Sequence, residues 1–269
     1  MKRHLLVALV ALVAPLAPVA PVALAFADVT IKSNIVGKGV GMGGAMTSVT
    51  YLKGAKMRNE MVVGDTTRVS IFDAEAKKMY AFDTKTKEVE VFDMQKLSDD
   101  IAKSVQVNDM KTSFKANGQT KQIAGKEATG YDMEVSIPST MGGEKGMKVI
   151  VGVAGPVWIV KGAPGTQDYM SFYKNAAEKG WLFTDPRQAA AQPGQAKAMA
   201  EMYRQMAATG GIPYEQEMTI KLTGDGQLAA AFAKMGNISM TTTVTSIDTG
   251  VLAASLFTVP EGYKLKERK

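Results

Sequence analysis

The chain has no cysteine, and its 269 residues include a single histidine, His4. Disulfides and thiol nucleophiles are therefore excluded. Because His4 lies in a segment that we expect to be removed, the mature chain also lacks the commonest general base and transition-metal ligand. An enzyme can be built from carboxylates, lysine or tyrosine, but sequence spacing brings no pair of carboxylates to one site. We therefore expect a protein that is not an enzyme and has no catalytic residues.

Long apolar runs are also missing, except at the N-terminus. There, an apolar stretch from Leu5 to Leu24 follows a short basic start, and Ala25-Phe26-Ala27 fits the small-x-small cleavage pattern of signal peptides. We expect residues 1–27 to be a cleaved signal peptide, with Asp28 as the first residue of the mature protein. No cysteine follows the apolar stretch, as the lipid attachment site of a bacterial lipoprotein requires.

The rest of the chain has no run of about 18 consecutive apolar residues, so we expect no transmembrane segment in the mature protein. No change in composition divides residues 28–269, which we expect to form a single domain. The signal peptide predicts export, and the mature protein is therefore expected in the periplasm or secreted from the cell.

The mature chain has only a small excess of positive charge. The loss of Lys2 and Arg3 with the signal peptide lowers the formal net charge from +6 to +4. No cluster of lysine and arginine with interleaved aromatic residues is present, so nucleic acid is not expected as a partner. The sequence identifies no protein partner.

Short alternating patterns dominate the first third of the mature chain. From Asp28 to about Val91, runs of about six residues alternate apolar and polar side chains and are separated by turn residues. This pattern is typical of an antiparallel sheet with one solvated face. A short helix is predicted from Met94 to Val105, where apolar residues recur every four positions.

Strand patterns return in the middle of the chain. Asn117-Gly118 predicts a hairpin turn, because this dipeptide adopts the positive φ angles that tight hairpins need. Val149–Val153 and Val157–Val160 predict two strands separated by Gly155-Pro156. Trp158 is expected to lie half-buried on a face of the sheet.

A helical insert of about residues 166–210 interrupts the strands. Thr166–Gly180 and Ala189–Thr209 carry apolar side chains at spacings of three and four, which predicts two amphipathic helices. The residues on these apolar faces are Tyr169, Phe172, Tyr173, Met199, Met202, Tyr203 and Met206. Two further strands are expected after the insert, around a short helix near Leu228–Met235.

Several short sequence segments, in their order along the chain, resemble segments of a known family. They are Tyr51-Leu52-Lys53-Gly54 with Lys56-x-Arg58, Ile71-Phe72-Asp73, Lys78-Met79-Tyr80, Ile123-Ala124-Gly125, Val157-Trp158 and Ser255-Leu256-Phe257-x-Val259-Pro260-x-Gly262-Tyr263. Together they resemble an uncharacterised family of exported bacterial proteins related to the lipoprotein-carrier (LolA/LolB-like) superfamily. The segment from Asp185 to Gly210 departs from the family pattern.

The resemblance implies an α+β fold with a strongly curved antiparallel β-sheet, a half-barrel, whose concave face is covered by helices. In the characterised relatives, the cavity under the helices holds acyl chains. We therefore expect a non-catalytic protein that binds a lipid, a lipoprotein acyl chain or another apolar molecule. The expected cavity residues are Tyr169, Phe172, Tyr173, Met199, Met202, Tyr203, Met206 and Trp158.

Two alternatives to this hypothesis stay open. The same aromatic and methionine side chains are also typical of a filled core, as in an envelope structural or interaction protein without a ligand. Met199, Met202 and Met206 also have the soft sulfur atoms that bind Cu(I), although no histidine accompanies them. We expect neither a metal site nor a cofactor. Gly39-x-Gly41-x-x-Gly44 resembles a dinucleotide-binding loop, but a strand pattern follows it where a helix is required.

Basic residues near the start of the sheet are candidates for a lipid-headgroup site. Lys53, Lys56 and Arg58 lie close together in the sequence and would form a positive rim if they bordered the cavity. The simpler interpretation is a solvated sheet face, as is usual for such a run of charges.

The signal peptide leads to a first prediction. The exported protein is expected to begin at Asp28, because Ala25 and Ala27 provide the small side chains that signal peptidase accepts. Intact-mass measurement with N-terminal sequencing of the secreted or periplasmic protein checks this. Recovery of the chain with Met1 still attached would contradict it.

Overall fold

The computed structural model describes residues 27–39, 44–104, 110–141, 146–181, 186, 193–224 and 227–268. The expected signal peptide therefore lies outside the described residues, apart from Ala27. Among the described residues, no helix combines the length and the apolar character needed to cross a bilayer.

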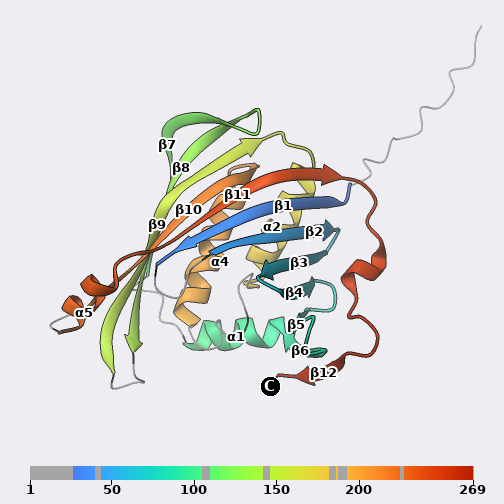
Figure 1. Ribbon diagram of the computed structural model, residues 1–269, viewed down its shortest axis with the longest axis horizontal. Coiled ribbons are helices and arrows are strands. Elements are labelled where there is room, and N and C mark those ends of the chain that lie inside the picture. Colours follow the sequence, from blue (N-terminus) through green and yellow to red (C-terminus); the bar gives the residue numbers. More distant parts are fainter. Residues whose placement is uncertain are drawn as a thin grey trace, which may run out of the picture.

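Among the described residues, one sheet of twelve strands dominates the structure (Figure 1). The strands are β1 (Val29–Lys38), β2 (Gly44–Lys53), β3 (Lys56–Val63), β4 (Thr66–Asp73), β5 (Lys78–Asp83), β6 (Glu88–Asp93), β7 (Lys111–Ile123), β8 (Lys126–Met141), β9 (Met147–Lys161), β10 (Gly211–Gly224), β11 (Ile238–Thr249) and β12 (Lys264–Glu267). Their order in the sheet is β12-β6-β5-β4-β3-β2-β1-β11-β10-β9-β8-β7. All pairs are antiparallel except β12 with β6. The expected α+β fold with a large antiparallel sheet is confirmed.

Helices pack mainly against one face of this sheet. They are α1 (Met94–Ser104), α2 (Thr166–Glu178), α4 (Pro193–Ala207), α5 (Gln227–Met235) and the short 3₁₀ helix η2 (Ala254–Phe257). Phe172 of α2 packs with Phe72 of β4, and Met202 of α4 packs with Ile159 of β9. We call the face covered by α2 and α4 the inner face and the opposite one the outer face (Figure 1). The two helices predicted for the insert are α2 and α4.

Alternation along the strands sends neighbouring residues to opposite faces of the sheet. On β3, Met57 is buried on the inner face opposite Phe72, whereas Arg58 faces outward opposite Ile71. Both faces of β4 are apolar, because Ile71 and Phe72 are each almost completely buried. The expectation of one solvated face is therefore wrong for β4, and a strand of this kind needs a cover on each side.

The last part of the chain covers the outer face of β4–β6. Residues 250–268, which we call the C-terminal strap, run from β11 along the edge of the molecule to β12 (Figure 1). Phe257 packs on the outer side of β4–β6 in a cluster that contains Ile71 and Phe82. Asp28 holds the start of the strap, because its carboxylate accepts hydrogen bonds from the Leu252 amide at 2.7 Å and from Lys53 Nζ at 2.6 Å.

The hairpin predicted at Asn117-Gly118 is wrong. β7 continues through this dipeptide to Ile123, and the turn to β8 is formed by Ala124-Gly125, with φ angles of 51° and 72°. The register between β7 and β8 shifts after Ala116, so the dipeptide forms a bulge. The Asn117 side-chain amide stabilises the bulge. Its Nδ2 donates to the Asp132 carboxylate at 2.9 Å, and its Oδ1 accepts from the backbone N–H of Gln119 at 3.0 Å.

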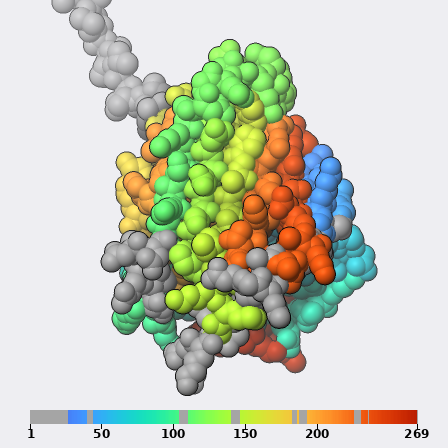
Figure 2. Space-filling model, turned by 90° about the vertical axis from the view of Figure 1, so that its left-hand side faces the viewer, coloured from blue at the N-terminus to red at the C-terminus, as the bar shows by residue number. Residues whose placement is uncertain are grey.

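The two strands predicted around Gly155-Pro156 are also wrong, because they are one strand, β9. Gly155 is needed for close approach to β10, since a Cβ atom here would lie 2.0 Å from the Glu217 carbonyl oxygen. A glycine within a strand pattern can indicate a close approach of a neighbouring backbone as well as a turn. Figure 2 views the molecule from the side on which β7, β8 and β9 run alongside one another.

The strap provides a test of how the outer face is stabilised. Phe257→Ala is expected to lower the free energy of unfolding by about 3 kcal/mol, because it removes a buried ring from the cluster on β4–β6. Urea denaturation followed by circular dichroism measures this change. Val251→Ala, at a strap residue that is 96% exposed, is the control and should change stability by less than about 0.5 kcal/mol. Equal effects of the two substitutions would contradict the role of Phe257.

Candidate functional site

A cavity of about 150 Å³ lies between the inner face of the sheet and the helices α2 and α4. Its wall on the sheet comes from β1, β2, β10 and β11, which are neighbours at the middle of the sheet. The helices contribute Tyr169 and Tyr173 from α2 and Tyr203 and Met206 from α4. The cavity therefore lies where residues distant in sequence converge.

The sheet wall carries a stripe of polar side chains. Its members are Ser33, Ser48, Thr50, Gln216 and Thr242, which we call the polar stripe. Strand register brings them together, because Ser33 is paired with Ser48 and Gln216 with Thr242. Paired residues on adjacent strands point to the same face.

Asn59 supports one end of the polar stripe. It lies on β3 beside Thr50 and donates hydrogen bonds from Nδ2 to Ser48 Oγ and Thr50 Oγ1, both at 2.9 Å. These bonds satisfy hydroxyl lone pairs and leave the two hydroxyl protons directed elsewhere. At the other end, Gln216 Nε2 donates weakly to Met133 Sδ at 3.8 Å.

Apolar residues complete the sheet wall. Ile31 and Ile35 of β1, Ile212 of β10 and Val244 of β11 border the same space. The cavity thus presents hydroxyl and amide groups beside aliphatic side chains, which suits a ligand with a polar and an apolar part.

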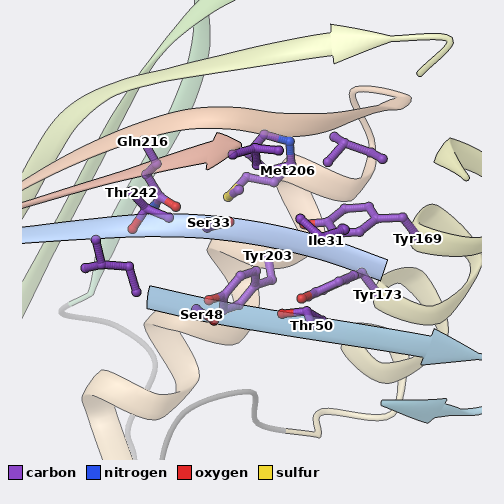
Figure 3. A pocket seen from close by; sticks show the side chains of 14 residues that line it. Ile31, Ser33, Ser48, Thr50, Tyr169, Tyr173, Tyr203, Met206, Gln216 and Thr242 are labelled. Carbon is purple, nitrogen blue, oxygen red and sulfur yellow. The ribbon is translucent and has the colours of Figure 1, made fainter. Parts of the chain in front are cut away.

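Three tyrosines form the wall opposite the sheet. The ring centroids of Tyr169 and Tyr173 are 4.3 Å apart, and those of Tyr173 and Tyr203 are 5.8 Å apart. Figure 3 shows these side chains reaching from the helices toward β1 and β2. The Tyr173 hydroxyl donates to Met57 Sδ at 3.9 Å, which ties α2 to β3.

The phenols of this wall are held in the neutral form. Burial raises the pKa of Tyr169 well above its usual value, and the neighbouring Tyr173 and Tyr203 raise it further. Burial also raises the pKa values of Tyr173 and Tyr203. In the part of the chain that the structure describes, none of the residues that line the cavity is a lysine, arginine, aspartate, glutamate or histidine. The lining is therefore uncharged at physiological pH and acts through hydrogen bonds and apolar contact.

Half of the cavity residues expected from the sequence line this space. Tyr169, Tyr173, Tyr203 and Met206 do so. Phe172 is instead part of the core, with its ring against Phe72 at a centroid distance of 5.8 Å. Met202 and Met199 pack against the strand residues of β8 and β9. Met199 and Met202 follow the same helical spacing as Tyr203 and Met206, but they pack against the sheet beside the cavity and do not line it.

Trp158 lies on the outer face, away from the cavity. It is paired with Glu215, whereas the next residue, Gln216, points into the cavity, and neighbours in a strand face opposite sides. The ammonium of Lys121 lies 4.2 Å from the centroid of the Trp158 ring and pairs with Glu215 at 2.5 Å. This tryptophan is only 8% exposed and belongs to a buried cluster with Ile123 and Tyr214, so the expected half-burial is wrong.

The expected basic rim is not at the cavity either. Lys56 and Arg58 alternate with Met57 on β3 and therefore face outward. Lys53 pairs with Asp28 and Lys56 with Asp73, both at 2.6 Å. Arg58 pairs with Glu60 at 2.7 Å and donates to the Leu256 carbonyl at 3.0 Å, which fixes the strap. These cations have structural partners and do not border the cavity.

Sequence reasoning missed the polar stripe. A signal was present in Ile31-x-Ser33-x-Ile35 and in Ser48-x-Thr50-x-Leu52, where a hydroxyl stands at a position that alternation assigns to the apolar face. Serine and threonine are ordinary strand residues, so this signal is weak without knowledge of what covers the face. The described residues also contain no group of three or more histidine, cysteine, aspartate or glutamate side chains that could hold a metal ion.

The neutral tyrosines predict a specific alkaline instability. A tyrosine whose folded pKa is raised stabilises the fold below the unfolded pKa of about 10, and this stabilisation is lost as the pH rises through the folded pKa. Between pH 10 and 11.5, Tyr169→Phe is therefore expected to flatten the fall in unfolding free energy by up to about 1.4 kcal/mol per pH unit. Urea denaturation at pH 8, 10 and 11 measures it. Parallel curves for the two proteins would contradict the burial of this phenol.

Comparison with known proteins does not assign the chain to a family. No protein-family model matches it, and no curated protein matches it. An uncharacterized conserved protein from Thermus thermophilus is similar in structure over 91% of this chain and 92% of its own, with 8% identity and a TM-score of 0.39. PNGF-II is similar over 90% of this chain and 31% of its own, with 10% identity and a TM-score of 0.35. Both TM-scores lie below 0.5, so neither likeness carries an argument about fold, ligand or activity.

Proposed function

We propose that this protein is an exported, non-catalytic binding protein that holds a lipid, an acyl chain or another largely apolar molecule. The site is the cavity between the inner face of the sheet and helices α2 and α4. The observation that carries the proposal is that Tyr169, Tyr173, Tyr203 and Met206 converge on one space with Ile31 and Ile35. A concave, mostly apolar space with a few converging polar groups is the usual form of a small-molecule site.

The arrangement of the helices supports a half-barrel. β6 and β7 lie near opposite ends of the sheet, with only β12 beyond β6. α1 nevertheless contacts β6, α4 contacts β7, and the two helices contact each other. A flat sheet of this width would keep its ends far apart, since neighbouring strands are about 4.8 Å apart. Curvature around the helices accounts for these contacts, and α2 and α4 would then cover the concave face.

The size of the cavity limits what it can enclose. An engineered protein cavity of about 150 Å³ holds one benzene molecule, and the space described here is of the same size. A long acyl chain would therefore extend beyond the cavity or displace α2 and α4. The insert of about residues 166–210 would act as the movable cover in that case.

Two other functions are outcomes of the test. A structural role without ligand is favoured by the burial of Phe172 and Met202, which fill the core instead of lining the cavity. Cu(I) binding rests on the sulfur atoms of Met199, Met202 and Met206, of which Met206 alone borders the cavity.

Native mass spectrometry of the exported protein, with organic extraction of bound molecules, tests the proposal. Wild-type protein is expected to carry a bound apolar molecule or to take up offered laurate or 1-monolauroylglycerol. Ser33→Phe should abolish this uptake, because the added ring fills the cavity. Asn34→Phe is the matched control, since Asn34 is exposed on the other side of the same strand.

The outcomes separate the candidates. Loss of uptake in Ser33→Phe alone, with the far-ultraviolet circular dichroism unchanged, supports the cavity. A clean mass in wild-type protein with no uptake of either probe would sink the binding proposal and favour the structural role. A bound copper mass would instead favour the methionine site.

A further inference from the structure

We infer that the cavity selects an uncharged, hydroxylated group of about the size of glycerol, either as a free polyol or as the head of a neutral lipid. This inference rests on the proposed function, because it names the chemistry of the ligand at the same site. It is carried by the polar stripe together with the tyrosine wall opposite it (Figure 3).

The lining excludes a charged head. Among the described residues, no cationic or anionic side chain borders the cavity, so a buried carboxylate, phosphate or ammonium would have no counter-charge from them. Burying an unpaired ion is far more costly than burying a hydroxyl. The basic residues Lys53, Lys56 and Arg58 are paired on the outer face and cannot supply the missing charge. A phospholipid or fatty-acid head is therefore disfavoured at this position.

The lining also disfavours an entirely apolar occupant. Within the described part of the chain, Ser33 and Thr242 have no hydrogen-bond partner for their hydroxyls, and the Gln216 side-chain oxygen has none. Ser48 and Thr50 accept from Asn59 and keep their own protons as donors. An alkyl group here would exclude water from these groups without replacing its hydrogen bonds, at a cost of about 1–3 kcal/mol for each fully buried group.

Hydroxyl groups match this lining because each is both a donor and an acceptor. The stripe hydroxyls and the neutral phenols of the tyrosine wall are of the same chemical type, although the Tyr173 proton is already donated to Met57 Sδ. Ile31, Ile35 and Val244 border the same space and provide apolar contact for the carbon skeleton or for the first methylenes of a chain. A neutral polyol satisfies both parts of the wall.

The test uses probes with one chain and different heads. Calorimetric titration of the exported protein at pH 7.5, below the micelle concentration of each probe, compares 1-monolauroylglycerol, laurate and dodecyltrimethylammonium. 1-Monolauroylglycerol is expected to bind at least about ten-fold more tightly than either ion, because only its head is neutral and hydroxylated. Glycerol alone and glucose alone distinguish the sources. Affinity equal to that of the lipid indicates a free polyol, and much weaker binding indicates a lipid head.

A matched pair of variants locates the contact. Thr242→Val is expected to weaken 1-monolauroylglycerol binding about five-fold, the loss of one neutral hydrogen bond, and to leave laurate unchanged. Thr243→Val is the control, because Thr243 is the next residue on β11 and is paired with Glu215 on the outer face. Thermal unfolding of both variants checks that the fold is retained.

Failure of the inference and failure of the proposed function give different results. If laurate binds as tightly as 1-monolauroylglycerol, or if Thr242→Val and Thr243→Val behave alike, the cavity does not select a hydroxylated head, although it still binds amphiphiles. If none of the probes binds and the extracted protein carries no small molecule, the binding function itself fails.

Discussion

In the described part of the chain, the structure depends on covering the inner face of a twelve-stranded sheet and the outer face of its strands β4–β6. Strand alternation places Ile71 on one side of β4 and Phe72 on the other, and each is almost completely buried. α2 and α4 supply the cover on the inner face, and the C-terminal strap supplies it on the outer face. The strap is in turn held by Asp28, the first residue expected after signal-peptide cleavage, and by Arg58. Two residues of the expected charged rim therefore stabilise the outer cover, Arg58 directly and Lys53 through Asp28, whereas Lys56 pairs with Asp73 on β4.

The cavity lies where the inner cover is incomplete, and there the sheet departs from an apolar lining. Ser48 is only 9% exposed, and burying its hydroxyl is tolerated because Asn59 donates to it. Apolar packing alone would place valine or isoleucine at these positions and avoid the desolvation of several hydroxyls. A neutral polar stripe facing three neutral phenols is thus a costly arrangement for a core and a useful one for a binding site.

Local sequence patterns predicted most of the strands and helices. The meander of β1–β6 and the helices α1, α2 and α4 follow from alternation and from spacings of three and four. Glycine was ambiguous, because Asn117-Gly118 forms a bulge and Gly155 allows close approach to β10. Asn117-Gly118 and Gly155-Pro156 are both typical of tight turns. Only the neighbouring strand determines whether such a dipeptide forms a turn or lies within a strand. Phe172 and Tyr173 are sequence neighbours on one helix, yet one fills the core and the other lines the cavity.

The sequence by itself determined that short alternating segments would form an antiparallel sheet, that two amphipathic helices would interrupt the strands, and that no thiol would be available for chemistry. These properties are local, since they depend on periodicity and residue type. Only the tertiary structure decided which face α2 and α4 would cover, that Trp158 and Arg58 would point away from them, and that hydroxyls from β1, β2 and β11 would meet. Those outcomes depend on the register between strands distant in sequence and on the depth at which each helix packs. Neither is encoded in the pattern of any single segment.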